Sequence, residues 1–148
     1  MKRSRFLPLV LVAVSSLASE PTATVQQQND RYEKQILERI AGRESEPAEE
    51  VFRNIQWLDG IPSARLLRIM NAGYSRALGV TCTHCHLESD FASDEKRPKR
   101  AAREMAVMHR AINEQLEAMK NLQADVAKRS INCNTCHRGQ VSPLAASR

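Results

Sequence analysis

The 148-residue chain has few aromatic side chains, with one Trp, two Tyr and three Phe. It also lacks an alternating run of β-branched residues of the kind that marks a half-buried strand. Its longest apolar run, residues 6–14, is well short of the ~20 residues needed to cross a bilayer. These absences exclude a β-sheet domain and a transmembrane span in the mature chain. They predict an all-α protein whose small aliphatic core would gain from a large apolar cofactor.

The net charge of +5 is concentrated at the N-terminus, where Lys2, Arg3 and Arg5 precede the apolar run. Without these three charges the remainder carries +2, too little to predict nucleic-acid binding. A basic start, an apolar run and small residues up to Ala18 are the three parts of a secretory signal peptide. We therefore expect residues 1–18 to be a signal peptide and the mature protein to act in the periplasm or another extracytoplasmic space. An uncleaved membrane anchor is the alternative.

Residues 19–50 are expected to lie outside the main domain. Residues 21–29 are polar and include three consecutive Gln, which is typical of a flexible leader. From Asp30 the apolar residues recur at helical spacing up to Gly42, and a charged stretch follows. This pattern predicts a solvated peripheral helix followed by a linker.

Residues 51–143 are expected to form the single domain, with residues 144–148 as a tail. Apolar side chains at helical spacing predict one helix from Pro62, a residue suited to a first helical position, to Gly79, which can close the helix as a left-handed cap. A second long helix is predicted over residues 98–122.

The chemistry of the chain lies in a motif that occurs twice and uses every cysteine. Residues 82–86 and 133–137 both read Cys-x-x-Cys-His, the attachment signature of a c-type haem. In this motif two thiols add across the two vinyl groups of the porphyrin, and the following imidazole binds the iron. We therefore predict two covalently attached c-type haems. The attachment residues are Cys82, Cys85, Cys133 and Cys136, and the proximal iron ligands are His86 and His137.

Other readings of the cysteine pairs are weaker. A Cys₄ zinc module or two disulfides would leave the histidine after each pair unexplained. A dihaem peroxidase-like enzyme would need a five-coordinate iron with acid–base groups over it, and His84 and His109 are the only spare imidazoles. An electron carrier is therefore favoured over an enzyme.

A sixth, thioether ligand would complete each iron and raise its reduction potential. Met70 lies 12 residues before Cys82 on the helix predicted to end at Gly79, so we predict it as the sixth ligand of the first haem. For the second haem the spacing alone leaves several candidates open. These are Met105, Met108, His109 and Met119.

The order of these motifs resembles that of the cytochrome c subunit of photosynthetic reaction centres. The likeness covers roughly residues 51–143. It includes residues 78–81 before the first motif, the Ala-Arg-Glu-Met-Ala-Val-Met stretch at 102–108, and residues 133–139. Subunits of that family typically carry four haems, so this chain resembles a two-haem, half-length member.

The resemblance implies a function and a ligand set. In the family a Met on the helix that lies along each haem is the sixth ligand, which maps to Met70 for the first haem and to Met105, in preference to Met108 and His109, for the second. It also implies transfer of single electrons between redox proteins, with a membrane-bound reaction centre or respiratory complex as a partner.

A run of basic residues begins ten residues after His86. Bases in the first turn of a helix oppose its macrodipole, so we expect a compensating anion beside them. A haem propionate would suit one or two of the arginines and an acidic redox partner the others, while an ordinary solvated helix start is the alternative. The basic residues are Lys96, Arg97, Lys99, Arg100 and Arg103.

Overall fold

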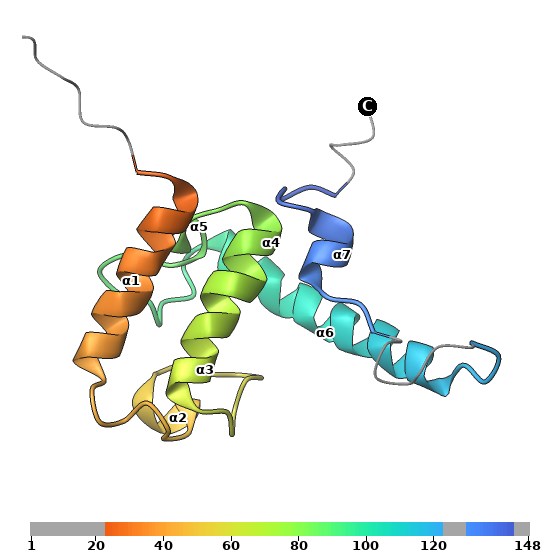
Figure 1. Cartoon of the computed structure of the whole chain (residues 1–148), viewed down its shortest axis with the longest axis horizontal. Helices are drawn as coiled ribbons and strands as arrows, with labels where there is room; N and C mark the ends of the chain where they lie inside the picture. Colours follow the sequence, from red (N-terminus) through yellow and green to blue (C-terminus); the bar gives the residue numbers. More distant parts are fainter. Residues whose placement is uncertain (1–22, 123–129, 144–148) are drawn as a thin grey trace, which may run out of the picture.

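The computed structural model describes residues 23–122 and 130–143, and every regular element in these ranges is helical (Figure 1). The expected all-α class is therefore confirmed. None of the described helices is long and apolar enough to cross a membrane. The expected signal peptide at 1–18 and the tail at 144–148 lie outside the described residues.

Helix α1 (Val25–Arg39) begins earlier than the sequence suggested. Thr24 caps it through a reciprocal pair of hydrogen bonds: the Thr24 hydroxyl accepts from the Gln27 N–H at 3.2 Å, and the Gln27 side chain accepts from the Thr24 N–H at 2.9 Å. The interpretation of residues 21–29 as a flexible leader was therefore wrong from Val25 onward. Gln is a good helix former, and the cap fixes where the helix starts.

Helix α1 is also less peripheral than expected, because it packs beside the central helix of the fold (Figure 1). Asn29, in its second turn, is only 1% exposed. Ile40, just beyond its last turn, is buried as well.

The central helix is built from three consecutive segments, α3 (Ser63–Arg68), η1 (Ile69–Ser75) and α4 (Arg76–Leu78), which run on as one continuous rod (Figure 1). Leu66, Leu67 and Ala77 on this rod are buried and form much of the small aliphatic core. The rod ends at Gly79, whose φ of +68° is left-handed as the sequence predicts. The middle segment is π-helical, a wider winding that the sequence analysis did not foresee.

The short helix α2 (Ala48–Val51) lies against the start of the rod. The Ala48 N–H donates to the Ile61 carbonyl at 2.8 Å, and the Ser63 N–H donates to the Glu46 carbonyl at 2.9 Å. Ala48 and Ser63 are fully buried at this junction.

The long helix α6 (Arg97–Ala118) extends away from α1 and α3 (Figure 1) and ends before residue 122, where the sequence placed its end. Two short helices carry the cysteine motifs, α5 (Cys82–Cys85) after the rod and α7 (Cys133–His137) near the C-terminus. Helix α7, which carries the second motif, lies beside α4, the helix that precedes the first motif.

Candidate haem sites

The first motif starts on a turn that helix α1 holds in place. The Asn29 side chain donates to the Val80 carbonyl at 3.0 Å and accepts from the Cys82 N–H at 2.9 Å. Cys82 and Cys85 are free thiols, and burial raises the pKa of both, so they are protonated at neutral pH. Sequence reasoning missed Asn29, because a single Asn in a polar stretch gives no local signal of a partner fifty residues away.

The ring of His86 is oriented by the loop that follows it. Its Nδ1 lies 2.7 Å from the Phe91 carbonyl oxygen, and the two rings stack with centroids 4.9 Å apart and planes 18° from parallel. A carbonyl can only accept, so Nδ1 carries the proton and Nε2 keeps the lone pair that binds a metal.

The protonation of His86 also suits a ligand. Burial lowers the pKa of His86, the Phe91 carbonyl opposes this, and the positive charges of Lys99, Arg103 and Lys96 lower it further. The imidazole is therefore neutral at physiological pH, as binding to iron requires.

The four residues predicted for the first haem line one cavity of about 490 Å³. Met70 comes from the π-helical segment, the thiols of Cys82 and Cys85 from α5, and His86 from the residue after α5. A cavity of this size lies within the usual range for cofactor sites. Further lining residues are largely apolar or aromatic, among them Ile36, Val51, Phe52, Trp57, Leu67, Tyr74, Leu78 and Phe91.

Tyr74 also lies in the π-helical segment and packs edge-on against Trp57, with ring centroids 6.4 Å apart. Burial raises the pKa of Tyr74, and the charges of Cys133 and Cys85 act in the same direction. The phenol is thus a neutral wall residue that lies near both cysteine motifs.

The second motif also holds its histidine ring through a backbone carbonyl, but it lies in a more open setting and, unlike the first, its helix has a side-chain cap. Asn132 and Thr135 cap α7 reciprocally, with distances of 3.2 and 3.1 Å. The Nδ1 of His137 lies 3.0 Å from the Gln140 carbonyl oxygen, which again leaves Nε2 available. The Cys136 thiol is exposed.

Helix α6 carries three of the candidates for the sixth ligand of the second haem, and the fourth, Met119, is the exposed residue directly after its end. His109 Nε2 lies 2.8 Å from the Ile131 carbonyl oxygen, so His109 fastens the chain before α7 to α6 and is the weaker ligand candidate. Asn113 pairs with the same residue, accepting from the Ile131 N–H at 2.8 Å. Met105 and Met108 are 41% and 48% exposed, so both are accessible, and the preference for Met105 stays a prediction.

The end of α4 and the segment after α7, each of which adjoins one motif, meet at a pair of glycines. The Gly139 N–H donates to the Ala77 carbonyl at 2.8 Å, and a Cβ on Gly79 would overlap the Gly139 carbonyl oxygen. Both glycines have positive φ, +68° and +83°. Only a residue without a side chain fits at Gly79, so this contact fixes how α4 and the end of α7 approach each other.

The geometry does not favour the alternative readings of the cysteines. All four are free thiols, so neither pair forms a disulfide. Within residues 23–122 and 130–143, no three His, Cys, Asp or Glu side chains gather as a metal cage, as a Cys₄ zinc module would require.

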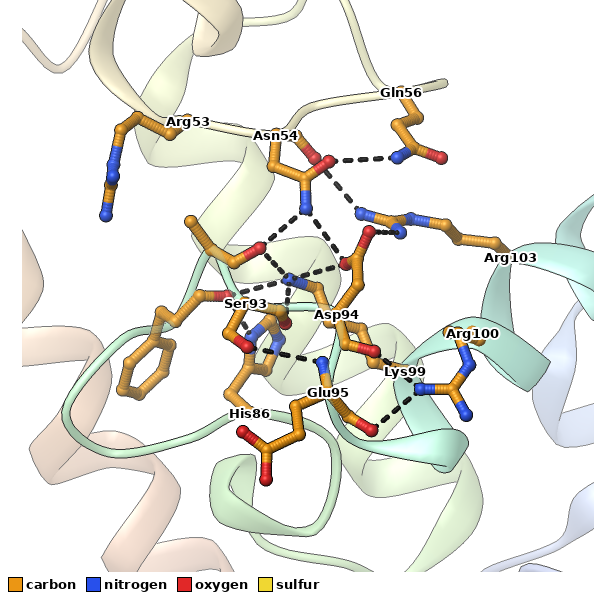
Figure 2. Close-up of polar contacts among 12 residues, drawn as sticks. Arg53, Asn54, Gln56, His86, Ser93, Asp94, Glu95, Lys99, Arg100 and Arg103 are labelled. Carbon is orange, nitrogen blue, oxygen red and sulfur yellow. Dashed lines mark hydrogen bonds and ion pairs between the residues drawn. The ribbon is translucent and has the colours of Figure 1, made fainter.

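Two of the basic residues at the start of α6 pair with an acidic side chain of the same chain (Figure 2). Arg103 pairs with Asp94 at 2.7 Å and Lys99 pairs with the same carboxylate at 3.3 Å. Hydrogen bonds from Arg103, Asn54 and Lys99 hold the pKa of Asp94 well below its usual range. Arg100 donates to the Asp94 and Glu95 carbonyls at 2.6 and 2.7 Å. The expected compensating anion is therefore Asp94, while pairing of Arg103, which also lines the cavity, with a propionate stays a prediction.

An all-α chain that carries two Cys-x-x-Cys-His turns has the architecture of a c-type cytochrome. Comparison with known proteins agrees: residues 12–146 match the model of the photosynthetic reaction centre cytochrome c subunit family. The chain belongs to this family, and the resemblance inferred from its motifs is confirmed.

Individual relatives match over shorter stretches. The chain is 40% identical to cytochrome c-554 of Chloroflexus aurantiacus over 92 residues, which is 62% of this chain and 21% of that protein. It is 33% identical to the photosynthetic reaction center cytochrome c subunit of Roseobacter denitrificans over 102 residues, 66% of this chain and 27% of that protein. It is 42% identical to the corresponding subunit of Rubrivivax gelatinosus over 82 residues, 48% of this chain and 22% of that protein. The chain thus matches about a fifth to a quarter of each relative's length.

Proposed function

We propose that the protein is an extracytoplasmic dihaem c-type cytochrome that carries single electrons between redox partners. The observation that carries the proposal is common to both motifs. In each, two free thiols precede a histidine whose Nδ1 is held by a backbone carbonyl, so that Nε2 is available to an iron. Members of this family are typically electron carriers, and family membership supports that role over catalysis.

The residues of the chain have distinct tasks in this proposal. The four cysteines form thioether bonds, His86 and His137 bind the two irons, and the haems supply the reversible one-electron change. Met70 completes the first site and Met105 the second. The wall of the first cavity has an apolar and aromatic part and also charged side chains, among them Glu33, Lys99 and Arg103. Its apolar part would favour the less charged, reduced iron.

The relation between the two sites suits electron passage. Gly79 and Gly139 join the segments that flank the two motifs, the end of α4 and the residues after α7, so both motifs are anchored close to one shared contact. The second site is the more open, because Cys136 and Met105 are exposed, which supports it as the side that meets a partner. A redox protein such as a membrane-bound reaction centre or respiratory complex is the partner class we propose.

One observation argues against the peroxidase-like alternative. That reading needs a spare imidazole as an acid–base group, and of the two in the chain, His84 and His109, the second is engaged with the Ile131 carbonyl. An electron carrier needs no such group.

The proposal is tested by counting haems. Protein produced with a c-type maturation system should keep its haem stain after denaturation, and its mass should exceed that of the polypeptide by two haems. Replacing Cys133 and Cys136 together by Ser should leave one haem. His84→Ala, a change inside the first motif at a residue that is not a ligand, should leave two. A wild-type chain that carries one haem or none would refute the proposal.

A further inference from the structure

Lys99 is a cation held almost out of water beside the first cavity. Its side chain is 11% exposed, and its Nζ lies 2.9, 2.8 and 2.8 Å from the carbonyl oxygens of Phe91, Ala92 and Ser93 (Figure 2). A buried ammonium is costly unless its three N–H groups find acceptors, and here they do. Such a residue is not the solvated surface base that its place in a charged run indicates.

The Phe91 carbonyl is the point at which Lys99 and His86 meet. Its oxygen accepts from His86 Nδ1 at 2.7 Å and from Lys99 Nζ at 2.9 Å. A carbonyl has two lone pairs and can accept both bonds, but a cationic donor on one withdraws electron density from the other. The bond that His86 donates is therefore weaker than it would be to an unshared carbonyl.

We propose that Lys99 raises the reduction potential of the first haem by sharing the Phe91 carbonyl with the proximal ligand His86. This inference rests on the proposed function, because it takes His86 as an iron ligand. A weaker hydrogen bond from Nδ1 leaves the imidazole less electron-rich, so it stabilises the oxidised iron less. The positive charge of Lys99 near the site disfavours the more positive, oxidised iron as well, so both effects have the same sign.

The neighbouring charges do not cancel this effect. Asp94 is the acidic side chain paired with Lys99, at 3.3 Å, but it forms a shorter ion pair with Arg103, at 2.7 Å. One carboxylate thus faces two cations, and a net positive charge remains. Asn54 donates to the Ala92 carbonyl at 2.6 Å and to the Asp94 carboxylate at 2.9 Å. Both groups are also partners of Lys99, so Asn54 fixes the loop whose carbonyls bind the Lys99 ammonium.

The test is a redox titration of holoprotein carrying Lys99→Gln. This change removes the charge and keeps a hydrogen-bond donor. We expect the midpoint potential of one haem to fall, so that its oxidised-to-reduced ratio at a fixed ambient potential rises roughly threefold to tenfold, about 0.7 to 1.4 kcal/mol. The other haem should be unchanged. The hyperfine-shifted resonances of the His86 ring in the oxidised protein should move with the potential, which a general loosening of the loop would not produce.

Two further variants separate charge from loop structure. Lys99→Arg retains the cation and should keep the potential close to wild type. Arg100→Gln is the matched control for loss of a positive charge from this loop, because Arg100 holds the Asp94 and Glu95 carbonyls without touching Phe91, and it should lower the potential by less than Lys99→Gln does. If Lys99→Gln carries two haems with unaltered potentials, or if Lys99→Arg lowers the potential as far as Gln does, the inference is wrong. A wild-type protein without haem would instead overturn the proposed function.

Discussion

Replacing Gly79 by Ala should destabilise the protein far more than the same change at another glycine of nearly identical backbone conformation. Gly79 has a φ of +68° and Gly60 a φ of +71°, and both lie outside helices. An alanine at either position bears the cost of a left-handed conformation, about 1–2 kcal/mol. At Gly60 nothing lies within 4 Å of the added Cβ, so the cost ends there.

At Gly79 the added methyl group would overlap the Gly139 carbonyl oxygen, which is backbone and cannot rotate away. Relief requires α4 and the end of α7 to separate, and this breaks the hydrogen bond from the Gly139 N–H to the Ala77 carbonyl. Loss of that bond costs about 0.5–1.5 kcal/mol, and packing between α4 and α7 is lost as well. We therefore expect Gly79→Ala to lower the free energy of unfolding by about 2–4 kcal/mol.

The assay is urea unfolding of the holoprotein, followed by far-UV circular dichroism, for wild type, Gly79→Ala and Gly60→Ala. The difference between the two variants isolates the contact, since their backbone costs are the same. Equal losses of stability in the two variants would refute the claim that Gly79 lets α4 pack against the segment after α7.

Three other outcomes are expected. Met70→Ala should lower the reduction potential of one haem and leave the other unchanged, and Met105→Ala should do the converse, as a redox titration of each variant would show; one variant shifting both haems contradicts separate ligation. Asn29→Ala should cost about 1–3 kcal/mol of unfolding free energy, because the buried Cys82 N–H and Val80 carbonyl lose their partner, whereas the exposed Gln35→Ala on the same helix should cost little. Because folding lowers the pKa of Asp94, its contribution to stability is complete above about pH 4 and disappears as the pH falls further. Acid unfolding of Asp94→Asn should lack this component. Identical acid unfolding profiles for the variant and the wild type would contradict a stabilising role for the Asp94 contacts with Arg103, Lys99 and Asn54.

The parts of the site that could be predicted from the sequence are those whose geometry is local. A Cys-x-x-Cys-His motif brings its thiols and imidazole together within a turn and a half of helix, whatever surrounds it. The left-handed cap at Gly79 is likewise a property of one residue and its helix. The placement of Met70 on the same cavity as His86 also followed, because a helix that ends shortly before the motif has to fold back beside it.

The features that escaped prediction depend on partners far apart in the chain. Asn29 holds residues about fifty positions away, and no periodicity marks it. Lys99 belongs to a run of bases that favours a solvated surface, yet three successive carbonyls of a loop draw its ammonium inward. His109 satisfied the spacing of an iron ligand, and only the position of Ile131 reveals that its ring also fastens two segments together.

The π-helical winding of Ile69–Ser75 has a consequence for how the chain tolerates insertions and deletions. In an ordinary α-helix each added or removed residue turns everything beyond it by about 100°. A wide turn takes up one extra residue locally, so the segments on either side keep their facing. Met70 lies at the start of this winding and Gly79 beyond its end, so the count of residues between them can change by one without turning Met70 away from the cavity. The π-helical segment therefore allows the number of residues between Met70 and Gly79 to vary by one while Met70 still lines the cavity.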